Sequence, residues 1–475
     1  MANGVAGDID YAQGTTLDVG KFLHGLPFTR FHVRLLLICS LVTFFDGLDF
    51  SLISFTLPYL ETDMSLSEQM LGYVSSAAFL GQMIGSLIGS YIADLVGRRP
   101  VILWCTVLSA ILTFLTGFAQ TPEMLIALRL VGGLAIGGLL APAWSVNIES
   151  MPLGRKATAV TIIMLGFSAG GAAAGQVTNF LVDDYGWEGV FFACGATTGL
   201  LAILLQFTMP ESVRWLAAKG KDPARIAALV NKFEPRIRAE RYTAFTLSDE
   251  RIVAKDSPWA KSAELFRGTL AWITPIIWFT YFCSSFAIYL KSSFGVLFLT
   301  RLGIDAKEAA NIGSITGITG AVLGVLVLMM TERRGPGWIA AVPLLGAPAA
   351  LFIGLDLFTD STFIPVVLFG GILIGAGHAA VISLTSIYYP SAVRSTGGGW
   401  ASFMAKFAAV TAPILASHWF LSNRNEVLDG YLFTALCLAG VVLGLMALAH
   451  FARRLKAEET AEAEALAAAP QPAAG

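Results

Sequence analysis

The chain has 475 residues, of which 55% are hydrophobic and 13% are charged, and its formal net charge is −2. A soluble protein carries about 25% charged residues, so this composition excludes an ordinary water-soluble domain. The small net charge argues against a nucleic-acid partner, and five scattered cysteines inside apolar runs fit neither a disulfide framework nor a zinc site.

The chain begins with a polar segment, residues 1–33, which lacks a short apolar stretch followed by a small-residue cleavage site. We expect this segment to be retained in the cytoplasm. Apolar runs of the length that spans a bilayer, about 20 residues as a helix, then recur along the sequence. They lie at roughly 35–60, 71–93, 100–120, 124–148, 157–182 and 189–208, and again at roughly 269–299, 308–331, 338–357, 362–389, 395–418 and 429–451.

This pattern predicts an all-α membrane protein of twelve transmembrane helices in two six-helix halves. The halves cover 34–208 and 269–452, and a polar cytoplasmic linker, 209–268, separates them. The tail, 453–475, is rich in Ala and is expected to be a disordered cytoplasmic segment. Glycines spaced four apart, such as Gly81, Gly85 and Gly89, are typical of close helix packing in lipid, and we assign them no substrate role.

Charged residues in the loops orient the helices. Basic residues occupy alternate short loops, the linker and the tail, whereas the other loops are acidic or nearly uncharged. Under the positive-inside rule both termini and the linker are cytoplasmic. We therefore expect a multi-pass protein of the bacterial inner membrane, with the lipid bilayer as its surroundings and a monomeric state.

The two halves carry similar loops. Asp94, Gly97, Arg98 and Arg99 follow the second helix, and Glu332-Arg333-Arg334-Gly335 follows the eighth. Each loop places an acid three residues before a glycine at the cytoplasmic end of an even-numbered helix. Paired six-helix halves place the substrate near the midplane, with access that alternates by rocking.

The first of these loops resembles the cytoplasmic loop motif of the major facilitator superfamily, which Asp94, Gly97, Arg98 and Arg99 match, although Ser90 and Leu95 depart from its usual glycine and basic residue. Within it, the sequence is most similar to the aromatic acid/proton symporters, whose Asp-Gly-x-Asp signature appears as Asp46-Gly47-Leu48-Asp49. Gly186-Trp187, Phe191 and the segment 389–397 match the same family, while 210–216 resembles a motif shared with sugar porters. The resemblance implies the major facilitator fold and proton-coupled uptake of an aromatic acid.

Asp46 and Asp49 are ionisable residues deep inside an apolar run, and such residues are functional candidates by default. They follow Arg34 by 12 and 15 residues, which places them about 18–22 Å from the cytoplasmic edge. Their spacing puts both carboxylates on one helix face, where two close acids favour the retention of one proton. We predict that they couple transport to protons; alternatively, one forms a structural ion pair with a neighbouring helix.

Four further side chains are candidates for substrate binding. Lys406 lies 12 residues beyond Arg394, at a predicted depth like that of Asp46, and either attracts the substrate carboxylate or neutralises an aspartate. His378 either relays protons or is a hydrogen-bonded packing residue. Arg129 either snorkels to the outer interface or has the functional role that the resemblance supports, and Lys291 is either a second anion ligand or, as we favour slightly, an outer-interface lysine.

The remaining candidates belong to a predicted cytoplasmic gate. Its members are acidic, basic or glycine residues at the inner ends of helices: Asp94, Gly97, Arg98, Arg99, Glu149, Arg155, Glu332, Arg333 and Arg394.

Together these features predict the symport of a small organic anion with protons, the anion being an aromatic carboxylate such as a hydroxybenzoate-like acid. The coupling proton is the only cofactor expected, and no metal. The alternative is a proton-coupled symporter of a sugar or a non-aromatic metabolite. A membrane enzyme or a sensor would need clustered catalytic groups or an output domain, and the sequence offers neither.

Overall fold

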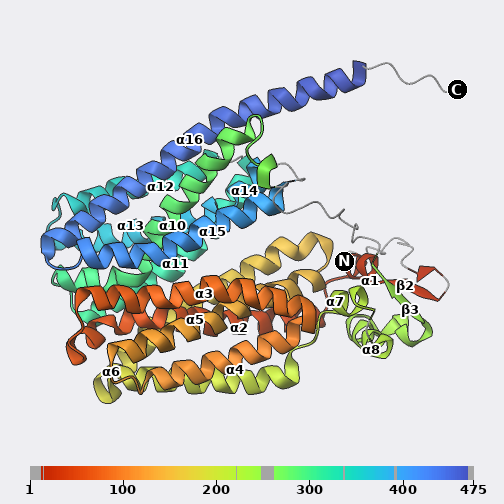
Figure 1. The fold of residues 1–475 in the computed structure, drawn as a ribbon, viewed down its shortest axis with the longest axis horizontal. Helices are drawn as coiled ribbons and strands as arrows, with labels where there is room; N and C mark the ends of the chain where they lie inside the picture. The colour runs from red at the N-terminus through yellow and green to blue at the C-terminus, as the bar shows by residue number, and fades with distance from the viewer. Residues whose placement is uncertain are drawn as a thin grey trace. The chain divides into compact units, whose positions relative to one another are not determined.

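The structure, a computed structural model, describes residues 12–13, 15–220, 222–247, 262–334, 337–389 and 393–468. Two units make up the chain: the first contains Met1–Val253 and Ser292–Ile318, and the second contains Ala254–Lys291 and Thr319–Gly475. Each unit is built around long apolar helices (Figure 1).

The elements before the linker are β1 (Ala12–Gln13), β2 (Thr16–Asp18), α1 (Val19–Gly25), α2 (Arg30–Asp63), α3 (Glu68–Val96), α4 (Arg98–Thr116), α5 (Pro122–Ser150) and α6 (Lys156–Thr208). The linker contains α7 (Val213–Ala218), α8 (Pro223–Phe233) and β3 (Ala244–Thr246). The later helices are α10 (Leu270–Arg301), α11 (Ala306–Arg334), α12 (Gly337–Gly354), α13 (Asp360–Val381), α14 (Leu384–Tyr388), α15 (Arg394–Trp419) and α16 (Arg424–Ala468).

Among the described residues, 11 helices are long and apolar enough to cross a membrane. One of them, α6, has 53 residues and bends at Gly186, where φ is 65° and ψ is −178°. At about 1.5 Å per residue, α6 is long enough for two crossings, and the bend falls between the predicted helices 157–182 and 189–208. The predicted all-α membrane fold is confirmed. The helix α16 continues to Ala468, through much of the tail whose composition predicts disorder; residues 469–475 lie outside the described part of the chain.

Glycines set the spacing of the helix pairs in the first unit, where α3 packs on α5 and α2 packs on α6 (Figure 1). A Cβ on Gly85 would lie 2.1 Å from the carbonyl oxygen of Leu134, and one on Gly81 would lie 2.1 Å from that of Leu130. The stripe of glycines therefore lets α3 and α5 touch through their backbones, as small residues do between membrane helices.

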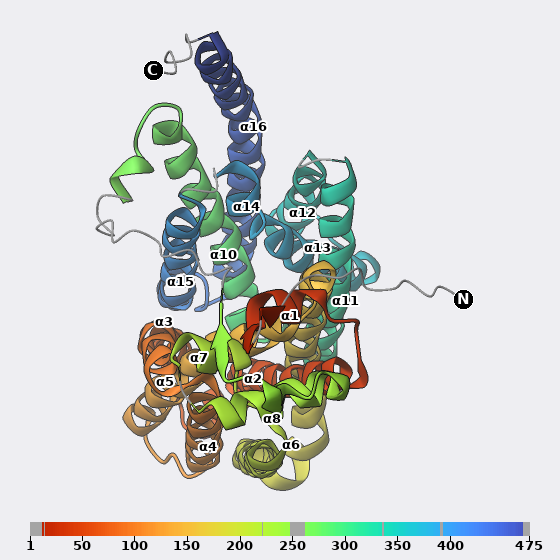
Figure 2. The same ribbon diagram turned by 90° about the vertical axis from the view of Figure 1, so that its right-hand side faces the viewer.

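The described residues before α2 and those at the start of the linker fold together, although the sequence predicts only a polar segment and a polar linker there. β1 pairs antiparallel with β2, and β2 pairs in parallel with β3, with Leu17 opposite Phe245. Buried apolar side chains of both segments form one cluster that includes Phe22, Trp215 and Phe233. We call residues 12–26 and 213–247 the cap (Figure 2).

The cap is attached to the ends of two helices of the first unit. The ring of Phe233 lies 4.3 Å from that of Phe31 and 5.4 Å from that of His32, measured between centroids. Lys156, at the start of α6, is hydrogen-bonded to His24 of α1 at 3.0 Å. The cap is therefore held at the end of the bundle that loop charges predict to be cytoplasmic.

We expect Gly85→Ala to destabilise the protein because the added methyl group must force α3 and α5 apart. Overpacking of this kind costs about 1–3 kcal/mol, so the apparent Tm in detergent should fall by at least about 2 °C. Gly199→Ala is the matched control, since nothing lies within 4 Å of its added Cβ and alanine favours helix. An unchanged Tm for Gly85→Ala would contradict the close backbone contact.

Candidate functional site

The two aspartates of α2 are both buried, with exposed fractions of 3% for Asp46 and 2% for Asp49. Gly47, between them, lies against α6, where an added Cβ would be 1.9 Å from the carbonyl oxygen of Phe167. Only a residue without a side chain fits at this contact. The glycine of this segment therefore places the carboxylate-bearing turn of α2 against α6.

Asp49 is joined to side chains of two neighbouring helices. Its Oδ1 accepts a hydrogen bond of 2.6 Å from the hydroxyl of Thr113 in α4 and one of 3.4 Å from Nη2 of Arg129 in α5. Arg129 is 2% exposed, and its guanidinium lies over the ring of Phe191, 5.3 Å from the centroid. The side chain of Arg129 thus turns into the bundle and does not extend to the outer interface.

Asp49 and Arg129 each have a polar side-chain atom that makes no hydrogen bond within the part of the chain that the structure describes. Asp49 Oδ2 and Arg129 Nε have no hydrogen-bond partner among the described residues. A buried pair of charges is stable when its remaining lone pairs and protons are satisfied. Each of these two atoms can therefore make one further hydrogen bond.

A second cluster lies at the predicted cytoplasmic ends of α3, α4 and α5. Nη2 of Arg98 is 3.1 Å from Asp94 Oδ1 and 3.3 Å from Glu149 Oε1. Ser212, just before α7, donates a hydrogen bond to Glu149, and Trp215 Nε1 donates to the carbonyl of Asp94 at 3.0 Å. Three of the predicted gate charges meet here, and the cap contributes to their contacts.

Glu211 organises this cluster; the sequence places it in the motif 210–216 but gives it no role. Its Oε1 accepts hydrogen bonds from the backbone N–H groups of Arg98 at 2.9 Å, Arg99 at 3.2 Å and Ser212 at 2.9 Å. The N-cap residue of α4 is Gly97, with φ at 114° and no side chain, so Glu211 supplies the missing cap from a distant segment. A carboxylate at a helix N-terminus satisfies free N–H groups and opposes the helix dipole.

The side chains of the other predicted gate residues that the structure describes make contacts outside the Arg98–Glu149 cluster. The guanidinium of Arg99 donates to the carbonyls of Met209 at 2.8 Å and Gln206 at 2.6 Å. Arg155 lies over the ring of Phe28, 5.5 Å from its centroid. Nε of Arg394 donates to the carbonyl of Tyr389 at 3.2 Å, and the side chains of Glu332 and Arg333 lie outside the described residues.

In the second unit, α10 and α13 share a row of polar contacts. The hydroxyl of Tyr281 donates to the carbonyl of Ile382 at 2.6 Å, Ser284 is hydrogen-bonded to His378 Nδ1 at 3.2 Å, and Nζ of Lys291 donates to the carbonyl of Gly371 at 3.0 Å. Two of the sequence candidates, His378 and Lys291, therefore belong to one helix pair. Lys406 lies on α15 and is half-buried.

At the other end of the first unit, polar contacts join α10 and α11 to α2 and α6. The sequence does not predict these contacts. Arg301 pairs with Glu61, and Lys307 pairs with Asp183. Gln176 Nε2 donates to Asn311 Oδ1 at 2.9 Å. These residues lie near the bend of α6 and near the ends of α2, α10 and α11 that the loop charges predict to be periplasmic.

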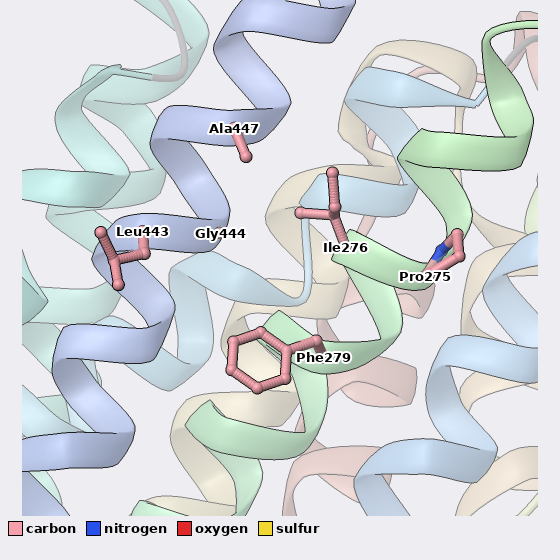
Figure 3. A pocket seen from close by; sticks show the side chains of 6 residues that line it. All are labelled: Pro275, Ile276, Phe279, Leu443, Gly444 and Ala447. Carbon is pink, nitrogen blue, oxygen red and sulfur yellow. The ribbon is translucent and has the colours of Figure 1, made fainter.

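One hollow of about 320 Å³ lies between α10 and α16 (Figure 3). Its lining is apolar and contains Pro275, Phe279 and Leu443, so it offers no group that would bind an anion. In the described part of the chain, no group of three or more His, Cys, Asp or Glu residues could hold a metal ion. The candidate groups are therefore two: the charged side chains of α2 and α5 in the first unit, and the polar side chains of α10 and α13 in the second.

The chain is similar over most of its length to known transporters. Residues 39–413 match the model of the Major Facilitator Superfamily. The 4-hydroxybenzoate transporter PcaK of Pseudomonas putida is 29% identical, over 90% of this chain and 96% of the relative. The gallate transporter of the same organism is 30% identical, over 93% of this chain and 96% of the relative.

Solved structures give the same fold. A bacterial homologue of the human lysosomal transporter Spinster matches with a TM-score of 0.67 at 17% identity, covering 90% of this chain and 98% of the other. The xylose transporter XylE from E. coli matches with a TM-score of 0.65 at 17% identity, covering 88% and 98%. The chain belongs to the Major Facilitator Superfamily and is a multi-pass membrane transporter.

We expect Arg129→Ala to lower the apparent Tm in detergent strongly because it leaves the buried carboxylate of Asp49 uncompensated. Breaking one side of a buried pair costs about 3–5 kcal/mol. The double variant Asp49→Asn with Arg129→Gln removes both charges and should recover most of the lost Tm. If the double variant is no more stable than Arg129→Ala alone, the two side chains do not form a coupled pair.

Proposed function

We propose that this member of the Major Facilitator Superfamily takes up a small aromatic carboxylate together with protons. The observation that carries the proposal is the pair of buried carboxylates on α2, one of which is paired with Arg129. Charges in membrane helices are rare and mark substrate or ion pathways. In a transporter, acids at this depth are suited to bind and release the coupling proton.

The names of the relatives support the substrate class. Both relatives of Pseudomonas putida described above carry aromatic acids in their names, and the alignments cover at least 90% of this chain. The second unit adds groups that suit an anion: Lys406, Lys291 and His378. Cations favour a carboxylate over a neutral sugar.

The geometry around Asp49 suggests how a proton and an anion could be coupled. A proton that binds Asp49 neutralises the carboxylate, and the guanidinium of Arg129 then lacks its counter-charge. The excess positive charge that results favours the entry of an anion, so the proton and the substrate carboxylate are favoured together. Asp46, one helical turn away, provides a second acid to which the proton can pass.

The transport cycle follows from the architecture of the superfamily. Two six-helix halves rock about a site near the midplane, and the Arg98–Glu149 cluster is the part that opens and closes the cytoplasmic side. We place the protein in the bacterial inner membrane, with both termini cytoplasmic, acting as a monomer.

Cells that express the chain should accumulate radiolabelled 4-hydroxybenzoate, and more of it at acidic than at alkaline external pH. An acidic exterior loads the aspartates with protons, so the inward proton gradient drives uptake, and an uncoupler should abolish accumulation. Asp46→Asn and Asp49→Asn should each lose accumulation. Initial uptake rates in cells that lack other aromatic acid transporters measure this.

The control variant is Asp360→Asn, which removes an exposed acid at the start of α13 and should transport like the unmodified protein. Accumulation that survives an uncoupler would disprove proton coupling. Accumulation of a sugar, with none of any aromatic acid, would disprove the substrate class.

A further inference from the structure

The row of polar contacts between α10 and α13 has a fixed register. Tyr281 faces Ile382, Ser284 faces His378, and Lys291 faces Gly371. As the residue number rises along α10, the number of the contacted residue falls by a similar amount, so the two helices run antiparallel. The row extends over ten residues of α10, or about 15 Å at 1.5 Å per residue.

Lys291 is a cation without a counter-charge in the described part of the chain. Its one polar contact is the carbonyl of Gly371, and no ion pair involves it among the described residues. A carbonyl dipole solvates an ammonium group but cannot neutralise it. Charged residues inside membranes pair with an opposite charge or line a polar cavity, so Lys291 is suited to bind an anion.

The position of Lys291 on its helix shows which way its side chain points. The most exposed side chains of α10 include Trp272 and Phe279, at 64% and 52% exposure. Lys291 is 12 residues beyond Phe279, which places it about 120° around the helix. Its ammonium group thus points away from the exposed face and toward α13.

Ser284 and His378 provide a second, neutral position on the same face. Ser284 lies seven residues before Lys291, two helical turns or about 10 Å along the axis. A hydroxyl and an imidazole can together donate and accept hydrogen bonds, which suits a phenolic hydroxyl. The ring of Tyr289 stands edge-on to His378, with 6.2 Å between centroids, and gives this position an aromatic wall.

We propose that Lys291 and the Ser284–His378 pair form a two-ended site for an aromatic acid: Lys291 binds the carboxylate, and the pair binds a hydroxyl on the far side of the ring. This site rests on the proposed function, and it adds which side chains bind the two ends of the aromatic acid. A ring substituted at opposite ends can bridge two positions separated by two helical turns. A benzoate without the hydroxyl occupies only the lysine end, so the site selects para-hydroxylated acids.

The test measures the affinity of the purified protein for benzoate and for 4-hydroxybenzoate by titration calorimetry in detergent. Lys291→Gln should weaken both ligands by about tenfold or more, because each loses a charged hydrogen bond. Ser284→Ala should weaken 4-hydroxybenzoate by about three- to tenfold, the value of a neutral hydrogen bond, and leave benzoate unchanged. General destabilisation of the protein would weaken the binding of both ligands, so a loss of affinity for 4-hydroxybenzoate alone in Ser284→Ala would have to come from the lost hydroxyl.

Matched controls are available on the same helix and in the linker. Ser285→Ala removes a buried hydroxyl on a different face of α10, and Lys219→Gln removes an exposed lysine; neither should change the affinity for either ligand. Lys291→Met, which keeps the apolar stem, replaces Lys291→Gln if that variant does not give a monodisperse protein.

Two outcomes overturn the site while leaving the proposed function intact. One is that the unmodified protein binds both acids and that Lys291→Gln and Ser284→Ala retain its affinities. The other is that Lys406→Gln removes carboxylate binding while Lys291→Gln does not. If the unmodified protein binds neither acid and transports none, the proposed function fails, and the two-ended site fails with it.

Discussion

A charge inside a lipid bilayer has no water to solvate it, so it is retained only where other groups compensate it. Asp49 meets this requirement through two helices at once, because Thr113 and Arg129 both donate to the same oxygen. The pair can form only if α2, α4 and α5 are fixed in register along the bundle. The fold of the first unit therefore has to bring Asp49, Thr113 and Arg129 from three different helices into contact in its interior.

Glycine contacts provide that register. Gly47 brings α2 onto the backbone of α6, and Gly85 brings α3 onto that of α5. In lipid there is no hydrophobic force to press helices together, so backbone proximity and packing must hold them. Gly47 lies between the two aspartates, which means that the same four residues of α2 carry both the charges and the contact that positions them.

The sequence predicts the features that depend on the residues of one segment alone. Run lengths and hydropathy locate the spans, and the depth of Asp46 and Asp49 identifies them as buried. Contacts between distant segments have no such signal: Thr113 is one threonine in an apolar helix, although it meets Asp49 across 64 residues. Glu211 belongs to the motif 210–216, but the motif does not reveal its partner, and the residue caps α4 across 113 residues. The cap is missed for the same reason, since its apolar residues are divided between two segments that each look polar.

The charges of the first unit differ in how much water reaches them, and this difference matches what a rocking transporter requires. The side chains of Lys307 and Asp183 are 41% and 64% exposed, whereas those of Arg129 and Asp49 are 3% and 2% exposed. An exposed pair contributes only about 0–1 kcal/mol, so contacts at the ends of the helices can break and re-form cheaply. A buried pair costs several kcal/mol to separate, unless a proton or an anion replaces one partner. In the proposed symport cycle, the exposed Lys307–Asp183 contact is therefore free to open thermally, whereas the buried Asp49–Arg129 pair changes state only when a proton or an anion binds.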